Sequence, residues 1–437
     1  MVPTRSWYIK GARILDPAAN RDEVSDLFVH DGRIAATPAG GPPPNVSVID
    51  ATGLVVAPGF IDLHVHLREP GGEDAETIQT GSAAAARGGF TTVVAMPNTN
   101  PPLDTPEALS FVMKQAKACG LVNVLPSACL TSNRKGTDLS DMKGLASAGA
   151  VAFTDDGSTV ADRGLMQRAM ALARQLNRPV FDHALDPILA GRGVMHEGLF
   201  SGANRLPGIP SAAEAVIVDR DIELARLTGC RVHIQHVSAQ SSISSIRNAV
   251  SEGLPVTCEV TPHHISLIDA DVDKENPSTK VNPPLRSGQD RDAIKQAVAD
   301  GIVAAFATDH APHTASSKNS GFLKAPFGMI GLETAVGVTY SLLAKTGLIG
   351  LARWIEMWTT GPARVLGMRV PTLEPGEAAD IVVLDLNEEW TVDPQAFLSK
   401  SRNTAFTGWT LTGQSKFTIL NGDLTWNSAL SRIDRRK

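Results

Sequence analysis

The middle of the chain, from about residue 58 to residue 370, alternates short apolar runs with longer amphipathic segments. The apolar runs predict strands at residues 60–66, 91–98, 122–128, 151–156, 179–183, 231–238, 256–263 and 303–310. Between them, segments such as 161–176, 212–227 and 290–299 carry apolar residues at helical spacing. Eight strand–helix units over this length predict a (β/α)8 TIM barrel, and a doubly wound open sheet is the alternative.

Both ends of the chain look like β structure. Near the N-terminus, residues 7–9, 27–29 and 46–49 are strand-like, and Asp31-Gly32 is typical of a hairpin turn. Near the C-terminus, residues 380–384 and 417–420 are strand-like, and an Asn-Gly turn follows at 421–422. Neither end has enough strands to bury its own apolar face, so we expect both to pair into one small sheet domain. The predicted division is therefore 1–57 and 371–437 for this domain and 58–370 for the barrel.

The overall composition excludes several classes of function. The 437 residues are 43% hydrophobic and 20% charged, with a net charge of −6, which argues against a nucleic-acid partner. The one basic cluster, residues 432–437, is a short tail. No apolar run approaches the length of a membrane span, and the N-terminal residues lack the apolar core of a signal peptide. The 4 cysteines are scattered without a CxxC motif, which indicates free thiols and a cytoplasmic location.

Polar residues gather at one end of the predicted strands. They lie at or near the C-terminal ends, where TIM barrels place their active sites. The residues are His64, His66, Asn98, Asp156, His183, His236, His263 and Asp309. Structural polar residues would be scattered over helix surfaces and strand starts instead. Of the 11 histidines, only His30 lies outside the predicted barrel.

Two of these residues sit on one strand. Side chains alternate faces along a strand, so His64 and His66 point the same way. Paired neutral imidazoles on a rigid face suit a divalent metal such as zinc. A single HxH pair is more often one core histidine and one solvated histidine, but here further candidate ligands follow. The full candidate set is His64, His66, Asp156, His183, His236 and Asp309.

Four imidazoles and two carboxylates exceed the needs of one tetrahedral zinc ion. They suit two metals that share a carboxylate and a hydroxide. Spacing leaves the aspartate undecided, because Asp155 and Asp156 face opposite ways and only one can point inward.

Several longer motifs identify a family. The chain resembles bacterial class I dihydroorotases of the amidohydrolase superfamily over essentially its whole length. The motifs are HVHLREPG at 64–71, MPNT at 96–99, FTDDG at 153–157, HEG at 196–198, TPHH at 261–264, NPPLR at 282–286, ATDHAPH at 307–313 and APFG at 325–328. Together they are highly specific, whereas HxH alone would indicate only the superfamily.

The resemblance implies a role for each candidate ligand. His64 and His66 would hold one zinc ion together with Asp309, and His183 and His236 would hold a second. Asp156 would bridge the two. Many related cyclic amidases use a carboxylated lysine as the bridge, and the aspartate here favours class I dihydroorotase over hydantoinases, dihydropyrimidinases and allantoinases.

The resemblance also implies the reaction, the reversible cyclisation of N-carbamoyl-L-aspartate to L-dihydroorotate in pyrimidine biosynthesis. A metal-activated hydroxide would attack the ring carbonyl, with Asp309 as general acid and base. Arg68 can meet the substrate carboxylate with a bidentate pair, although a salt bridge to Glu69 or Glu73 is an alternative role. The further expected substrate contacts are Asn98, Asn282, His313 and the backbone at Phe327 and Gly328.

Other features are less decisive. Residues 314–324 are polar and lie between two site motifs, so they are either a closing lid or an inert loop. We expect structural or supporting roles for His196, His263 and His264. The competing functions are another cyclic amidase, such as an allantoinase, and an inactive dihydroorotase-like subunit that serves as a scaffold. The resemblance further implies a homodimer and allows association with aspartate transcarbamoylase, and no nucleic-acid or membrane partner is expected.

Overall fold

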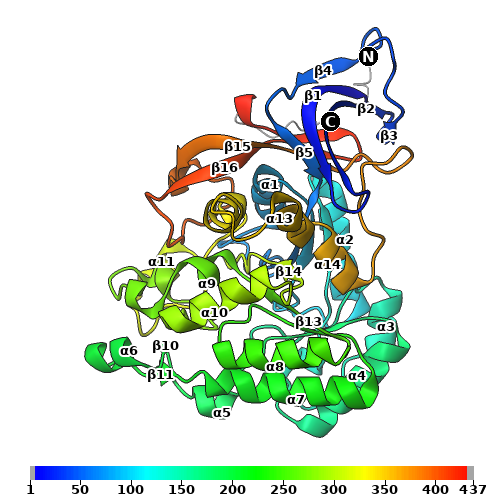
Figure 1. Cartoon of the computed structure of the whole chain (residues 1–437). Coiled ribbons are helices and arrows are strands. Elements are labelled where there is room, and N and C mark those ends of the chain that lie inside the picture. The colour runs from blue at the N-terminus through cyan, green and yellow to red at the C-terminus, as the bar shows by residue number, and fades with distance from the viewer. Residues whose placement is uncertain (1–4, 431–437) are drawn as a thin grey trace.

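A computed structural model of the protein describes residues 5–430, and the basic tail at 432–437 lies outside them. A barrel of parallel strands and surrounding helices forms one part, and a sheet built from both ends of the chain caps it (Figure 1). The TIM barrel and the small sheet domain are therefore confirmed.

Parallel pairing runs around the barrel. The strands are β6 (Phe60–Val65), β7 (Phe90–Ala95), β8 (Asn123–Pro126), β9 (Val180–Asp182), β12 (Val232–Ile234), β13 (Val256–Val260) and β14 (Ala305–Phe306). One sheet has the order β6-β7-β8 and another the order β14-β13-β12-β9. Single parallel bridges join them, from Ala128 to Phe153, from Phe153 to Val180 and from Val65 to His310. The eight-membered circle is closed by these bridges.

Several strands are shorter than predicted: the one predicted at 303–310 is β14, of two residues, and the one at 231–238 is β12, of three. Two other predicted strands differ in kind. The predicted strand at 151–156 is reduced to single bridges at Phe153, although the amides of Val151 and Thr154 still donate to the carbonyls of Pro126 and Ala128. The predicted strand at 256–263 ends at Val260, and the helix α9 (Pro262–Ser266) begins instead. Thr261 caps that helix by accepting a hydrogen bond from the His264 amide, and proline at the first helical position fits the start of a helix.

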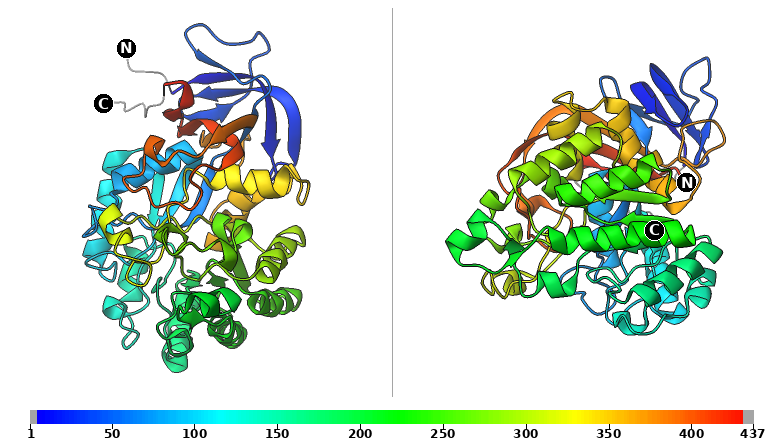
Figure 2. Two further views of the ribbon diagram at one scale, coloured as in Figure 1. Left: turned by 90° about the vertical axis from the view of Figure 1, so that its left-hand side faces the viewer. Right: turned by 60° about the horizontal axis from the view of Figure 1, so that its bottom comes forward.

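The predicted helices are confirmed to within two residues. They are α4 (Arg163–Gln175), α7 (Ala212–Thr228) and α10 (Gly288–Ala299). Further helices around the barrel are α1 (Ile78–Gly88), α2 (Pro106–Cys119), α8 (Gln240–Ser251), α13 (Leu351–Trp358) and α14 (Thr360–Leu366) (Figure 2). Local signals set their ends: Asp162 caps α4, and Gly229 terminates α7 with a φ of 64°.

The capping sheet joins the two chain ends. Its strands are β1 (Trp7–Asp16), β2 (Arg21–His30), β3 (Arg33–Ala35), β4 (Ser47–Asp50), β5 (Val55–Pro58), β15 (Ile381–Thr391), β16 (Thr410–Leu420) and β17 (Asp423–Asn427). The order is β17-β16-β15-β5-β1-β2-β3, with β4 on β1. The antiparallel pair of β5 with β15 joins the ends, and Figure 1 labels the two strands. The expected pairing is confirmed, and the division at residues 57 and 370 stays a prediction.

Aromatic side chains fill the core between the barrel and α13. The Phe60 ring lies 5.7 Å from Trp354 and 6.2 Å from Trp358, and both tryptophans are fully buried. Burying an aromatic side chain of this size stabilises the fold by roughly 2–3 kcal/mol. Because Phe60 starts β6, this packing anchors the strand that carries His64.

The loop between β15 and β16, residues 392–409, lies against the barrel, and we call it the strap. Glu333, which precedes α12 (Ala335–Thr339), accepts hydrogen bonds from the backbone amides of Leu398 and Ser399 at 3.0 Å. Its side chain is 2% exposed and pairs with Arg87 at 3.1 Å. A residue of the barrel thus fixes a segment of the sheet domain.

Burial raises the pKa of Glu333 from the ordinary 4.5 to about 7, although Arg87 works against the rise. Folded Glu333 therefore holds its proton between pH 4.5 and 7 while the unfolded chain releases it, so unfolding free energy falls as pH rises through this window. Glu333→Gln cannot ionise. Its unfolding free energy relative to wild type should rise between pH 5 and pH 8 by up to roughly 3 kcal/mol in urea denaturation. A difference that is the same at both pH values would contradict this account.

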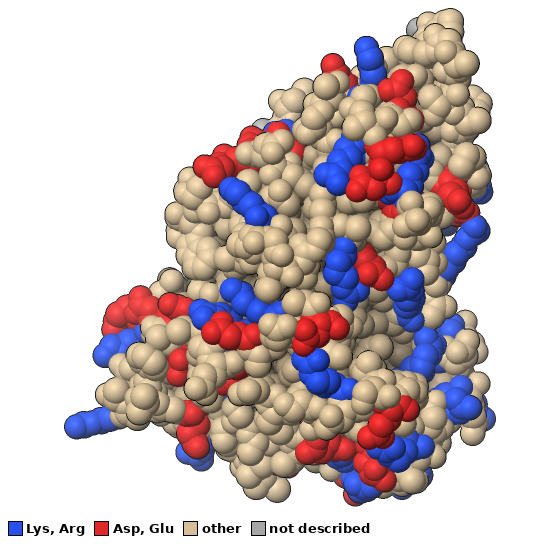
Figure 3. Space-filling model, viewed as in Figure 1, with Lys and Arg blue, Asp and Glu red and all other residues tan. Residues whose placement is uncertain are grey.

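Among residues 5–430, no helix is long and apolar enough to cross a membrane. On the face drawn in Figure 3, basic and acidic side chains are interspersed over the barrel and the sheet domain.

Candidate active site

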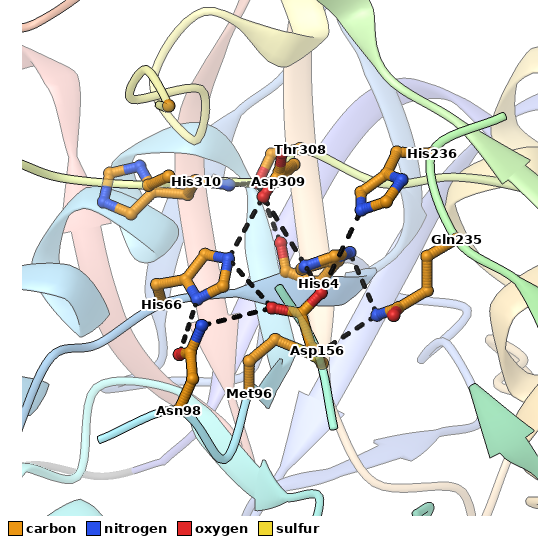
Figure 4. Close-up of polar contacts among 12 residues, drawn as sticks. His64, His66, Met96, Asn98, Asp156, Gln235, His236, Thr308, Asp309 and His310 are labelled. Atoms are coloured by element: carbon orange, nitrogen blue, oxygen red, sulfur yellow. Dashed lines mark hydrogen bonds and ion pairs between the residues drawn. The ribbon is translucent and has the colours of Figure 1, made fainter. Parts of the chain in front are cut away.

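The end of β6 delivers two imidazoles to the barrel mouth (Figure 4). The His64 Nε2 atom lies 3.2 Å from Asp156 Oδ1, and the His66 Nε2 atom lies 3.1 Å from Asp309 Oδ1. All four side chains are buried. The alternation of faces predicted for the HxH pair therefore places both rings against the two carboxylates.

A second pair of imidazoles lies on the other side of Asp156. His183 follows β9, His236 follows β12, and their Nδ1 and Nε2 atoms are 2.9 Å apart. The same Asp156 Oδ1 atom lies 3.9 Å from His183 and 4.0 Å from His236. Two groups that could each hold a metal ion result, His64–His66–Asp156 and Asp156–His183–His236. They share one carboxylate.

The two neighbouring aspartates have different tasks. The Asp155 carboxylate accepts hydrogen bonds from the amides of Leu130 and Thr131 at 2.9 and 3.1 Å. It therefore holds the loop after β8. Asp156 faces the imidazoles, so the structure selects the second aspartate, as the family resemblance implies.

The protonation states in the cluster suit a cation. Burial opposes charge, but His64 and neighbouring imidazoles hold the pKa values of Asp156 and Asp309 below those of ordinary aspartates. Burial lowers the pKa of His183 and, more strongly, that of His236. Ionised carboxylates beside the neutral imidazoles of His183 and His236 are donors suited to a divalent metal. His64 differs, because Asp156 and Asp309 raise its pKa well above the ordinary value against the effect of burial, so a bound metal would displace its proton.

Unsatisfied atoms point the same way. Within residues 5–430, the buried atoms His64 Nε2, Asp156 Oδ1 and His236 Nδ1 make no hydrogen bond, although the first two lie 3.2 Å apart as an ion pair. Buried polar atoms normally find a partner, and an ion is one reason why a native group lacks one. The residues therefore fit a metal.

Two buried residues that sequence reasoning missed orient His64. The His64 Nδ1 atom contacts Glu259 Oε1 at 3.0 Å, and the other oxygen of Glu259 contacts His233 Nε2 at 3.1 Å. A carboxylate on the rear nitrogen directs the Nε2 lone pair towards the cluster. A charged residue in the apolar run Val256–Val260 was the available signal.

The backbone is strained at three site residues. Arg68, His236 and Asp309 have φ values of 59°, 33° and 47°, in the left-handed region that residues other than glycine rarely adopt. Such strain persists only where surrounding contacts impose it, and it is concentrated at functional sites.

Arg68 follows the HxH pair and contacts the loop after β14. Its Nε donates to the Pro312 carbonyl at 3.1 Å, and its Nη2 lies 3.5 Å from His313 Nε2. The two glutamates proposed as alternative salt-bridge partners of Arg68 are engaged elsewhere. Glu69 accepts a hydrogen bond from the Ile78 amide, and Glu73 accepts one from the Gly71 amide. Burial and Arg68 lower the pKa of His313 to about 3, so this imidazole is neutral. The carboxylate-binding interpretation is favoured over the rim salt bridge.

The site residues surround one cavity of about 200 Å³. Apart from His64, which is fully buried and does not line it, every residue predicted for the site lines it: His66, Arg68, Asn98, Asp156, His183, His236, Asn282, Asp309, His313, Phe327 and Gly328. Asn98 Oδ1 accepts a hydrogen bond from His66 Nδ1 at 2.9 Å, and Asn282 Nδ2 lies 3.2 Å from His183 Nε2. Candidate metal donors and a guanidinium thus line a single small cavity.

Gly328 closes the cavity by close approach. A Cβ atom there would lie 2.6 Å from Ala311 Cβ, and its φ is 121°. Its amide donates to the Lys280 carbonyl at 2.9 Å and its carbonyl accepts from Lys318 Nζ at 2.8 Å. Both polar groups are therefore used within the protein, and Gly328 offers the cavity only its shape.

The candidate lid, residues 314–324, begins with the short helix α11 (Ala315–Lys318). Lys318 is buried, and its Nζ also donates to the Pro326 carbonyl at 2.9 Å. The segment is therefore tied to the cavity wall in this structure. Its role as a lid stays a prediction.

The remaining motif histidines lie away from the cavity wall. His264 contacts the Thr261 hydroxyl at 2.8 Å and the Pro283 carbonyl at 3.0 Å. His196 lies 3.4 Å from Arg286, which also donates to the Ile209 carbonyl at 2.9 Å. These contacts of His196 and His264 hold loops together, which agrees with the structural roles expected for them, whereas the role of His263 stays a prediction.

Comparison with known proteins identifies relatives over nearly the whole chain. The family described as dihydro-orotase-like matches residues 53–242. The chain is 46% identical to a dihydroorotase of Solibacter usitatus (strain Ellin6076) over 425 residues, which cover 97% of this chain and 99% of the relative. It is 48% identical to a dihydroorotase of Pelotomaculum thermopropionicum over 427 residues, with the same coverage.

Solved structures share the fold. An L-hydantoinase (dihydropyrimidinase) from Arthrobacter aurescens has a TM-score of 0.85 at 25% identity, over 96% of each chain. A dihydropyrimidinase from Brevibacillus agri has a TM-score of 0.86 at 21% identity, over 98% of this chain and 96% of its own.

Proposed function

Because the chain belongs to the dihydroorotase family, we propose that its barrel cavity interconverts N-carbamoyl-L-aspartate and L-dihydroorotate. The observation that carries this proposal is the shared cavity, in which Arg68 stands beside two overlapping groups of metal donors. A cyclic amide with a carboxylate on its ring needs both features.

The donor set favours zinc, with two ions per chain expected. His64, His66 and Asp309 would hold one ion, His183 and His236 the other, and Asp156 both. When bound, the metal pair supplies a hydroxide nucleophile near neutral pH and polarises the ring carbonyl. Glu259 would keep the Nε2 atom of His64 aimed at the first ion.

Asp309 is the proposed proton carrier. Ring opening breaks a C–N bond, and the leaving nitrogen needs a proton. Asp309 lies at the cavity wall beside His66, at 3.1 Å, so its carboxylate can take a proton from the nucleophile and deliver it to that nitrogen. In the closing direction it removes a proton from the carbamoyl nitrogen.

Arg68 is the proposed carboxylate anchor. Its Nε donates to the Pro312 carbonyl, which holds the guanidinium plane in place, and its Nη2 lies 3.5 Å from His313 Nε2, where both residues line the cavity. Asn98 and Asn282 would orient the ring, and Phe327 and Gly328 would shape the wall on its far side.

Hydantoinases and dihydropyrimidinases share the fold, so another cyclic amidase is the second candidate. Two features disfavour this candidate. The bridging position holds Asp156 rather than lysine, and a ring without a carboxylate would offer Arg68 no group to bind. The inactive-scaffold alternative is disfavoured because each expected ligand is present in the cluster.

One experiment tests the function. The purified chain is assayed for metal by elemental analysis and for hydrolysis of dihydroorotate, hydantoin, allantoin and dihydrouracil. We expect bound zinc and a strong preference for dihydroorotate. Preference for an uncharged ring would favour the other cyclic amidases, and a metal-bearing chain inactive on all four rings would favour the scaffold.

A homodimer, association with aspartate transcarbamoylase and a cytoplasmic location stay predictions. The first two rest on the family resemblance and the last on the scattered thiols.

A further inference from the structure

We propose that Asn403, in the strap, is a positioning residue for the carboxylate subsite at Arg68. The proposal rests on the proposed function, because it concerns how the substrate carboxylate is received. Asn403 lies far from the barrel motifs in sequence and comes from the sheet domain.

The carboxamide of Asn403 is fully engaged with two cavity loops. Its Oδ1 accepts from the His313 amide at 3.1 Å, and its Nδ2 donates to the carbonyls of Ala311 at 3.1 Å and Gly328 at 3.2 Å. The residue is 6% exposed. Its own carbonyl accepts from the Ile330 amide at 2.9 Å. One side chain therefore clamps the loop after β14 to the loop that closes the cavity.

The clamp encloses the atom that holds Arg68. Ala311 and His313 flank Pro312, whose carbonyl accepts from Arg68 Nε at 3.1 Å. The His313 ring in turn contacts the Phe327 carbonyl at 2.7 Å. Because Asn403 binds the residue on each side of Pro312, it determines where that carbonyl points and so where the guanidinium lies.

Apolar packing supports the same position. Phe406 of the strap is 1% exposed and belongs to a cluster with Met329, Ile330 and Val281. The strap thus approaches the cavity loops as a packed unit. A hydrogen-bonding side chain on such a rigid element can hold a loop within the tolerance that bidentate recognition requires.

Other residues also attach the strap to the barrel. A variant of one of them can therefore show whether an effect comes from positioning the cavity loops or only from attaching the strap. Ser401 Oγ donates to the Ala75 carbonyl at 2.7 Å and is 4% exposed. Glu333 holds Leu398 and Ser399. Ser401→Ala is therefore a matched control, because it removes a buried hydrogen bond of the strap that does not contact the cavity loops.

The test uses Asn403→Asp, which keeps the shape and the acceptor but loses both donors, and Asn403→Ala in case the charge prevents folding. With dihydroorotate as substrate, we expect KM to rise about ten- to hundredfold and kcat to change less. Zinc content should equal that of wild type. Ser401→Ala should lower the thermal midpoint without changing KM.

A double-mutant cycle with Arg68→Met is the sharper measurement. If Asn403 acts through Arg68, its replacement should add less than about twofold to KM once Arg68 is gone. Independent, multiplying effects would overturn the proposal, as would an unchanged KM in the single variants or a loss of zinc. If wild type does not hydrolyse dihydroorotate, the proposed function fails first, whereas active wild type with unaffected Asn403 variants rejects this inference alone.

Discussion

Replacing His64 with alanine is expected to abolish dihydroorotate hydrolysis and to remove at least one zinc ion per chain. His64 lies against both carboxylates of the cluster, at 3.2 Å from Asp156 and 3.5 Å from Asp309. Metal catalysis supplies several kcal/mol of transition-state stabilisation, and each 1.36 kcal/mol is tenfold in rate, so kcat/KM should fall on the order of 10³-fold or more. Elemental analysis and steady-state kinetics on the same sample give both readouts.

The matched control is His30→Ala. The His30 side chain is 63% exposed, lies in the sheet domain and pairs only loosely with Asp31 at 3.7 Å. It should keep full zinc content and activity. Circular dichroism should show both variants folded, since His64 sits at the end of β6 and its strand is anchored elsewhere by Phe60. Full activity of His64→Ala in a metal-free sample would reject the metal mechanism.

Replacing Arg68 with methionine is expected to lower kcat/KM for dihydroorotate by about 10²–10⁴-fold, because two charge-assisted hydrogen bonds to the carboxylate are lost. Zinc content should not change, since Arg68 donates to Pro312 and belongs to neither metal group. Arg68→Lys should recover only part of the loss, because an ammonium is a point charge without the planar fork.

Dihydrouracil, which lacks the carboxylate, is the substrate control. Wild type and Arg68→Met should differ little on it, so the ratio of the two substrates isolates carboxylate recognition. Equal losses on both rings, or loss of zinc from the variant, would show that Arg68 supports the fold instead of binding the substrate.

Much of the architecture could be predicted because its signals are local. Strand and helix periodicity repeats within each unit, and the hairpin turn at Asp31-Gly32 and the helix stop at Gly229 are encoded by adjacent residues. The errors fell where local signals conflict. At Thr261-Pro262, an apolar run continues in the sequence while a helix cap has already begun.

The candidate ligands could also be predicted, because barrel topology brings all strand ends to one mouth whatever the details of packing. The choice between Asp155 and Asp156 could not be made from spacing. It depends on which backbone amides the neighbouring loop presents. The amides of Leu130 and Thr131 donate hydrogen bonds to the Asp155 carboxylate, which leaves Asp156 to face the imidazoles.

The sequence by itself determined the barrel, the sheet made from both chain ends and the set of residues at the barrel mouth. Only the tertiary structure decided what holds them. Glu259 contacts the rear nitrogen of His64, the backbone at Arg68 is left-handed, and Asn403 binds the residues on both sides of Pro312. The physical reason is the range of the interaction. Periodicity and capping act over a few residues, whereas Glu259 and His64 lie 195 positions apart and Arg68 and Pro312 lie 244 apart.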